Sequence, residues 1–174
     1  MHYLRLTPRL QRLYAWIITV SQIRWHFEHY RELGVLRRPL DWKHFNWKYY
    51  NFLTEPRNLR LALYVDGFTP FSLFGRSHSV WPIVVISYNL PLNMCMTTPY
   101  MFISCVIPYP TNSKNIIDVY LQLLIDELNM LWDVGADTYN VSHRNTFRLH
   151  AALVWTIKEF SCMKCCSGGV LMSC

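Results

Sequence analysis

Residues 57–71 read RNLRLALYVDGFTPF, and this stretch decides the fold. Apolar residues recur there at every second position: Leu59, Leu61, Leu63 and Val65. This period of two predicts a β-strand with one buried face. The strand is expected to end at Asp66-Gly67, and Pro70 prevents its immediate resumption.

Asp66 stands at the end of this strand, and two interpretations of it are open. A carboxylate at the end of a buried strand lies at the rim of a sheet, where metal-dependent phosphoryl-transfer sites are often built. Asp followed by Gly is also the usual signal of a turn, and the spacing alone favours the plain turn.

Further strands and one long helix are predicted downstream. Residues 81–88 (WPIVVISY) and 100–107 (YMFISCVI) are apolar runs bounded by prolines, so they complete a three-strand meander. Residues 115–132 predict a helix that Gly135 ends. Its apolar stripe is Ile117, Leu121, Leu124, Leu128 and Leu131, and its solvated face carries Asp118, Asp126 and Asp133. A fourth strand is predicted near residues 149–157 (LHAALVWTI).

This order of elements predicts an α/β (α+β) chain with a partial RNase H-like fold. The expected architecture is a mixed sheet with a three-strand meander, a crossover helix and a fourth strand, preceded by a basic helical segment. In that topology the fourth strand lies parallel to the first and beside it, so Asp66 and Glu159 would face one another at one rim. Two converging carboxylates can hold divalent cations about 3.5–4 Å apart, and magnesium or manganese suits an all-oxygen site.

The positive charge is concentrated in the first third of the chain. Residues 1–60 hold eleven Lys or Arg and four Asp or Glu, whereas residues 61–174 hold six and seven; the net charge of all 174 residues is +6. A basic segment beside a neutral core is typical of a protein that binds a polyanion, above all nucleic acid. A solvated arginine surface would explain the same charge.

Two other classes of protein are disfavoured. Residues 77–113 contain no Asp, Glu, Lys or Arg, but prolines divide them into pieces too short for a membrane-spanning helix. The cysteines at the end of the chain, Cys162, Cys165, Cys166 and Cys174, contain one CxxC pair and no second, which disfavours a zinc site. The absence of a secretory signal and of a disulfide framework indicates an intracellular protein.

The N-terminal segment is expected to be helical at first and irregular later. Thr7 and Pro8 are typical of an N-cap and a first helical position, and a second helix is expected from Ser21 to Gly34. Residues 35–56 are expected to be irregular, with aromatic residues interleaved with basic ones. Such a segment can stack bases while it holds phosphates, or it can be a loop that its rings attach to the core, and the second interpretation is slightly favoured. The expected units are therefore residues 1–56, a core of residues 57–160, and a divergent cysteine-rich tail of residues 161–174.

Collinear blocks along the chain carry a family resemblance. They are TPRLQRLY (7–14), IRWH (23–26), GVLRRP (34–39), EPRNLRLALYVDGFTPF (55–71), YNLP (88–91), IDVYLQLLIDEL (117–128) and AALVWTI (151–157). In these blocks the chain resembles the transposases of plant CACTA-type (En/Spm-like) DNA transposons over nearly its whole length.

The resemblance implies a nuclear cut-and-paste DNA transposase with an RNase H-like core, three acidic residues and two Mg²⁺ or Mn²⁺ ions. It places the first acidic position on Asp66 and the second on Glu159. The family usually has aspartate, phenylalanine, proline and alanine at the second position, whereas this chain has Glu159-Phe160-Ser161-Cys162. The longer side chain is expected to disturb a site that needs placement within about 0.5 Å. The third acidic residue is expected downstream of Cys174, so we expect this chain alone to be inactive.

In this hypothesis the metals are held by Asp66 and Glu159, and DNA phosphates are contacted by Arg9, Arg12, Arg24, Arg37, Arg38 and Lys43. The transposase hypothesis is compatible with a protein that forms oligomers. The competing hypothesis is a non-catalytic remnant of a transposable element that binds nucleic acid or another protein. A third is a chain that does not fold stably, because half an RNase H sheet leaves an open edge and a bare apolar face.

Overall fold

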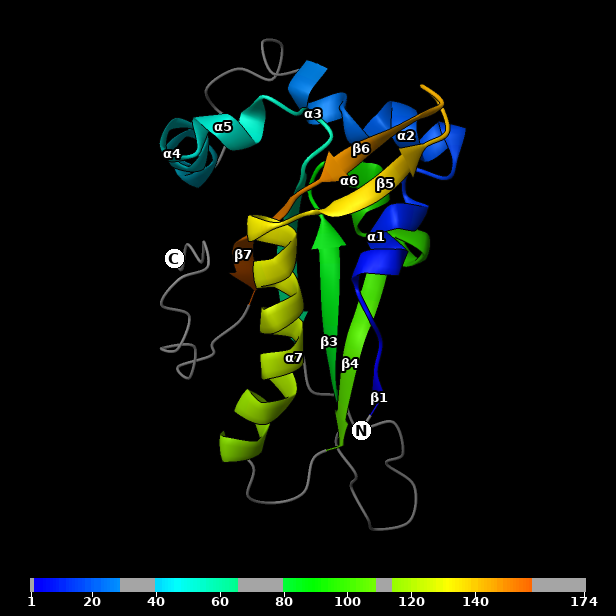
Figure 1. Cartoon of the computed structure of the whole chain (residues 1–174). Helices are drawn as coiled ribbons and strands as arrows, with labels where there is room; N and C mark the ends of the chain where they lie inside the picture. Colours follow the sequence, from blue (N-terminus) through cyan, green and yellow to red (C-terminus); the bar gives the residue numbers. More distant parts are fainter. Residues whose placement is uncertain (1, 29–39, 66–79, 109–113, 158–174) are drawn as a thin grey trace.

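A five-stranded sheet forms the centre of the computed structural model, which describes residues 2–28, 40–65, 80–108 and 114–157 (Figure 1). The strands lie in the order β1-β4-β3-β2-β7. Their bounds are β1 His2–Tyr3, β2 Leu59–Val65, β3 Val80–Ser87, β4 Met101–Pro108 and β7 Ala151–Ile157. Strands β2, β3 and β4 form the predicted antiparallel meander, and β7 pairs in parallel with β2, also as predicted.

The long helix α7, Lys114–Asp133, packs on this sheet through the apolar stripe that the sequence predicts. Leu121, Leu124, Leu128 and Leu131 are buried in the main core with the apolar residues of β2, β3 and β4. Asp126 and Asp133 are exposed, so this part of the predicted polar face is confirmed. As expected, Gly135 follows the end of the helix and prevents its continuation. Its φ of +75° is a conformation that glycine adopts without strain.

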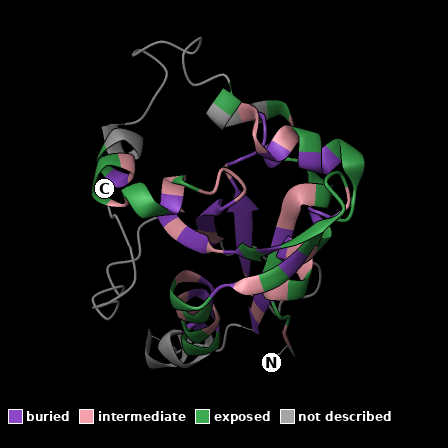
Figure 2. Cartoon of the chain, turned by 45° about the horizontal axis from the view of Figure 1, so that its top comes forward, coloured by how far each residue is buried: buried purple, intermediate pink, exposed green. Residues whose placement is uncertain are grey.

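Strand β2 is buried on both faces, which corrects the prediction of one buried face. Its leucines point into the main core, but Arg60 and Ala62 between them are also buried. The Arg60 guanidinium lies 5.9 Å from the ring centroid of Phe45 and 5.7 Å from that of Phe52. Burial lowers the pKa of Arg60 to about 10. Figure 2 shows the buried strands enclosed by elements whose outer faces are exposed.

The rings around Arg60 come from two helices that the sequence analysis missed. Residues 35–56 were expected to be irregular, but α4 spans Leu40–Lys48 and α5 spans Tyr50–Leu53. Phe45 and Phe52 form a second buried cluster with Ala152 and Val154 of β7. Trp132 of α7 joins this cluster, with its ring 5.4 Å from that of Phe52. Helical packing therefore attaches the segment to the core, while Trp47 and Tyr50 are 80% and 71% exposed.

The N-terminal helices also differ from their predicted limits. Helix α1 is Thr7–Arg12, α2 is Ile17–Ile23 and α3 is Trp25–Glu28. Ser21 lies inside α2 rather than at its start, and the predicted end at Gly34 lies outside the described residues. Leu10, Leu13 and Tyr14 are buried in the main core, whereas Ile17 is 65% exposed.

The N-cap of α1 is Leu6 rather than the predicted Thr7, and its side chain makes no capping hydrogen bond. The capping acceptor comes from another helix instead. The carboxylate of Glu127 on α7 accepts hydrogen bonds from the N–H groups of Leu6 (2.9 Å) and Thr7 (2.8 Å) and from the Thr7 hydroxyl (2.6 Å). The Tyr3 hydroxyl donates to the same carboxylate. Burial alone would raise the pKa of Glu127, but these hydrogen bonds outweigh it and the pKa is lowered. One side chain thus attaches β1 and α1 to α7.

A hairpin that the sequence analysis did not predict lies between α7 and β7. It consists of β5, Ala136–Asn140, and β6, Asn145–Leu149, so the fourth core strand begins at Ala151 rather than at Leu149. The hairpin packs on the N-terminal segment: the Val141 N–H donates to the Tyr14 carbonyl (3.1 Å), and the Tyr14 and Phe147 rings lie 5.0 Å apart. The remaining short helices are α6, Leu92–Cys95, and the 3-10 helix η2, Thr98–Tyr100.

Two buried asparagines connect the ends of the central strands. The Asn58 side chain donates to the Phe52 carbonyl (3.0 Å) and accepts from the His150 N–H (3.0 Å). Asn89 donates to the Asn58 carbonyl (2.8 Å) and accepts from the Arg60 N–H (2.7 Å). These bonds give Asn58 and Asn89, the asparagines of the EPRN and YNLP stretches, a structural role. They fix β2 against α5, β3 and β7.

Candidate functional site

The first candidate site is the rim at which β2 and β7 both end (Figure 1). The last pair in their described parallel register is Tyr64 with Ile157. Asp66 comes two residues after Tyr64, and Glu159 comes two residues after Ile157. Both acidic residues lie outside the described residues, so the structure brings together the strand ends that precede them.

A β-bulge sets the register at this rim. Leu59 and Leu61 pair with Ala151 and Leu153, each 92 positions further along, whereas Ala62 pairs with Trp155, 93 positions further along. The register shift leaves Val154 as the extra residue on β7. Val154 is buried in the cluster that holds Phe45 and Phe52, so the bulge is packed rather than exposed.

Metal ligands were predicted at Asp66 and Glu159 alone. Among the residues that the structure describes, no three His, Cys, Asp or Glu side chains gather closely enough to hold a metal ion. The described ranges likewise contain no helix long and apolar enough to cross a bilayer. The C-terminal cysteines lie outside these ranges.

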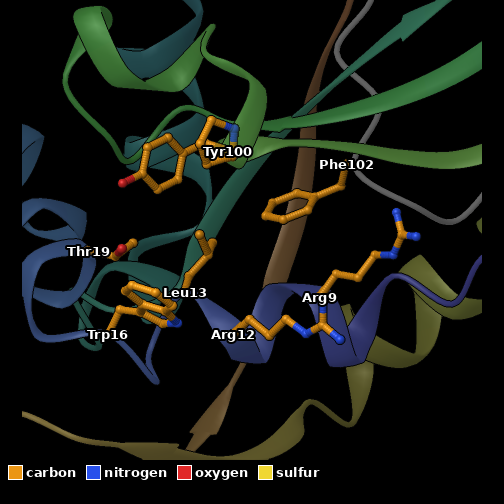
Figure 3. Close-up of a pocket in the computed structure, with 8 residues that line it drawn as sticks. Arg9, Arg12, Leu13, Trp16, Thr19, Tyr100 and Phe102 are labelled. Atoms are coloured by element: carbon orange, nitrogen blue, oxygen red, sulfur yellow. The ribbon is translucent and has the colours of Figure 1, made fainter.

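Arg9 and Arg12, which were predicted to contact phosphates, line one pocket of about 510 Å³ beside α1 and the start of β4. Figure 3 shows the rings of Tyr100 and Phe102 across this pocket from α1 and Trp16. The Arg9 guanidinium donates to the Ile103 carbonyl (2.6 Å), which holds it against β4. Phe102 pairs with Val85, and Val85 with Leu63, so Phe102 lies two strands away from Leu63, on the order of 10 Å.

Of the other predicted phosphate contacts, the structure describes the side chain of Arg24, which does not line this pocket. Arg24 lies 3.3 Å from the Glu28 carboxylate and lines a second pocket, of about 330 Å³, with Glu55 and Arg57. The Arg57 guanidinium donates two hydrogen bonds to the Glu55 carboxylate, at 2.7 and 2.6 Å, and the Arg57 N–H donates a third at 3.0 Å. Burial would raise the pKa of Glu55, but the bonds from Arg57 lower it. Arg37, Arg38 and the Lys43 side chain lie outside the described part of the chain.

Sequence reasoning found the arginines of the larger pocket but missed its aromatic side chains. Trp16 was given no role, and Tyr100 and Phe102 were assigned only to the strand of residues 100–107. In the structure Trp16 is the N-cap residue of α2 and is 69% exposed, because the chain bends between α1 and α2. The signal for this break is weak, since no glycine or proline occurs in residues 9–28.

The comparison with protein families supports the transposase part of the resemblance and covers its blocks from residue 34 onward. Residues 33–173 match the model described as transposase family tnp2. No curated protein and no solved structure matches the chain. Because the match covers most of the 174 residues, the chain belongs to the transposase family tnp2.

Proposed function

We propose that the chain is the core of a cut-and-paste DNA transposase of the CACTA type, with an RNase H-like fold, that acts on transposon ends in the nucleus. Asp66 and Glu159 hold Mg²⁺ or Mn²⁺ in this proposal. Membership of the tnp2 family supports a transposase-related role, and the sheet supports the fold. Three antiparallel strands, a helix and a strand parallel to the first form the order expected for that fold.

The register of β2 and β7 is the observation that carries the proposal. If it continues for two residues beyond Tyr64 and Ile157, this register would set Asp66 opposite Glu159. Opposed positions in neighbouring strands are about 4.8 Å apart and direct their side chains to the same face of the sheet. Without the bulge at Val154, the position opposite Asp66 would fall on Lys158, which cannot ligand a metal ion.

The donor set fits the proposed metals. Two carboxylates and water supply the hard oxygen ligands that Mg²⁺ and Mn²⁺ prefer. When bound, such ions activate an attacking oxygen and stabilise the leaving oxygen of a phosphodiester. The contribution of this chain is to present two carboxylates from adjacent, hydrogen-bonded strands.

Metal binding tests the proposal directly. We expect Mn²⁺, followed by electron paramagnetic resonance, to bind the wild-type chain and to bind Asp66→Asn and Glu159→Gln at least tenfold more weakly. Asp133→Asn is the matched control, because Asp133 is exposed at the far end of α7 and removing it should leave Mn²⁺ affinity unchanged. Equal Mn²⁺ affinity in the wild type and in both rim variants would overturn the proposed role of the two carboxylates.

A second candidate function is nucleic-acid binding without catalysis, and the arginines beside α1 favour it. It predicts DNA binding that weakens as the salt concentration rises, because cations on the protein displace counterions from phosphates. It also predicts that Asp66→Asn leaves DNA affinity unchanged in Mn²⁺ as well as in its absence. An effect of Asp66→Asn that appears only with Mn²⁺ would favour the metal-dependent function instead.

A further inference from the structure

We propose that the pocket beside α1 binds one unstacked nucleotide of DNA, with its base against the Trp16 ring and its phosphate at Arg9 and Arg12. The inference rests on the proposed function for the nature of the partner, which is DNA. It adds a defined site and a preference for unpaired DNA. Neither requires Asp66, Glu159 or a metal ion.

The charge of the pocket matches a phosphate. Two arginines line it, and no Asp or Glu is among its lining residues. Arg12 is exposed, and within the described ranges the structure shows no hydrogen bond or ion pair to its guanidinium. Arg9 is half-buried and uses one N–H on the Ile103 carbonyl, so its remaining N–H groups can still donate.

The walls of the pocket match a base. Leu13 and Phe102 are buried and form an apolar floor, while Trp16 at the mouth exposes 69% of its surface. An aromatic ring left in water beside a basic group is the arrangement that stacks bases in proteins that bind single strands. A base on Trp16 would remove apolar surface from water on both partners.

The size of the pocket selects an unpaired nucleotide over a duplex. A volume of about 510 Å³ lies in the range that holds one small molecule. A paired base within a duplex keeps its faces covered by its neighbours, so it cannot present a face to Trp16. A base at a gap, a flap or a distorted step can do so at little cost in unstacking.

Two DNAs of the same length that share one strand test the inference. The second strand is fully complementary in one DNA, and in the other it is mismatched so that three nucleotides at the centre are unpaired. Their dissociation constants are measured by fluorescence anisotropy in EDTA, so that no metal contributes. Stacking of one base is worth about 1–3 kcal/mol, so we expect the wild-type chain to prefer the unpaired DNA by about 5- to 150-fold.

Four variants separate stacking from charge. Trp16→Leu should abolish the preference, and Trp16→Phe should retain part of it. Arg12→Gln should weaken binding of the unpaired DNA more than binding of the duplex. The control Arg144→Gln removes the same charge at an exposed position in the turn of the β5–β6 hairpin, and it should leave the preference unchanged. Because Trp16 is exposed, thermal unfolding should show that Trp16→Leu folds normally.

The possible failures can be told apart. If the wild-type chain binds both DNAs equally, or if Trp16→Leu keeps the full preference, the nucleotide site is overturned while DNA binding stands. If neither DNA binds, the choice of DNA as partner fails and the inference fails with it, whereas Mn²⁺ binding at the rim remains a separate result. If inorganic phosphate or a phosphopeptide competes as strongly as a thymidine dinucleotide, the pocket is an anion site without base recognition, and the inference is again overturned.

Discussion

Exchanging Lys158 and Glu159 in a double variant, K158E with E159K, tests the register argument most sharply. The exchange leaves composition and net charge unchanged. One step along a strand moves a side chain about 3.3 Å and directs it to the opposite face of the sheet. The carboxylate would therefore leave the face proposed for Asp66, and an ammonium group would take its place.

The size of the effect follows from this displacement. A shift of about 3 Å is several times the roughly 0.5 Å that a metal site tolerates. An ammonium about 5 Å from the Asp66 carboxylate also attracts it by about 3 kcal/mol at an effective dielectric constant of 20, and so competes with the metal ion. We expect Mn²⁺ affinity to fall at least 100-fold, about 2.7 kcal/mol.

Mn²⁺ titration followed by electron paramagnetic resonance measures this loss, and circular dichroism verifies that the exchanged chain folds. Glu159→Asp is the companion variant: it restores the residue expected from the family resemblance and should bind Mn²⁺ at least as tightly as the wild type. If the exchanged chain binds Mn²⁺ within threefold of the wild-type affinity, the register beyond Ile157 does not determine the ligand and the reasoning is refuted.

Two further predictions concern the contacts that hold the fold. Glu127→Gln should lower the free energy of unfolding by about 2–3 kcal/mol, because charge-assisted hydrogen bonds to α1 are lost. The control Asp126→Asn, on the exposed face of α7, should change it by less than about 0.5 kcal/mol. Thermal unfolding measures both. Since the folded-state pKa of Glu127 lies below its ordinary value of 4.5, this advantage of the wild type is full above that pH and should shrink as the pH falls below it. An advantage that stays undiminished well below that pH would contradict the carboxylate cap. Asn58→Ala should cost about 2–5 kcal/mol in urea unfolding, because it leaves the buried Phe52 carbonyl without its donor and the partly buried His150 N–H without its acceptor. A loss below about 1 kcal/mol would show that water replaces the side chain.

The elements that the sequence predicted are those whose pattern is local. Strand β2 and helix α7 each repeat an apolar residue at a regular period over several turns or pairs, and a buried face selects that period. The α4–α5 region was missed although Phe45, Tyr49 and Phe52 recur at helical spacing, because basic and polar residues between them obscured the stripe. Strands β5 and β6 have five residues each and few apolar ones, so their alternation is short and weak.

Contacts between distant residues were not predictable from local patterns. Glu127 follows the exposed Asp126 of α7, so the sequence gives no sign that its carboxylate is partly buried. Its partners Tyr3, Leu6 and Thr7 are more than 115 positions away in the chain. The pocket beside α1 depends on a bend before Trp16 that no strong signal marks. The parallel pairing of β2 and β7 was predictable from the order of the elements, but the bulge was not, because a bulge is defined only once two strands are paired.

The bulge also connects the N-terminal segment with the proposed metal site. Val154, the extra residue of β7, is buried among Phe45 of α4, Phe52 of α5 and Ala152. Ala152 and Val154 are two positions apart, so a β7 strand without the bulge would also direct both side chains to this cluster, and the packing anchors β7 without selecting the bulge. The aromatic helices therefore hold β7 beside β2, and the bulge then sets the offset that, if continued, would bring Glu159 rather than Lys158 opposite Asp66 in the proposed site. In this view Phe45 and Phe52 act on the proposed site only through the packing of the strand that leads to it.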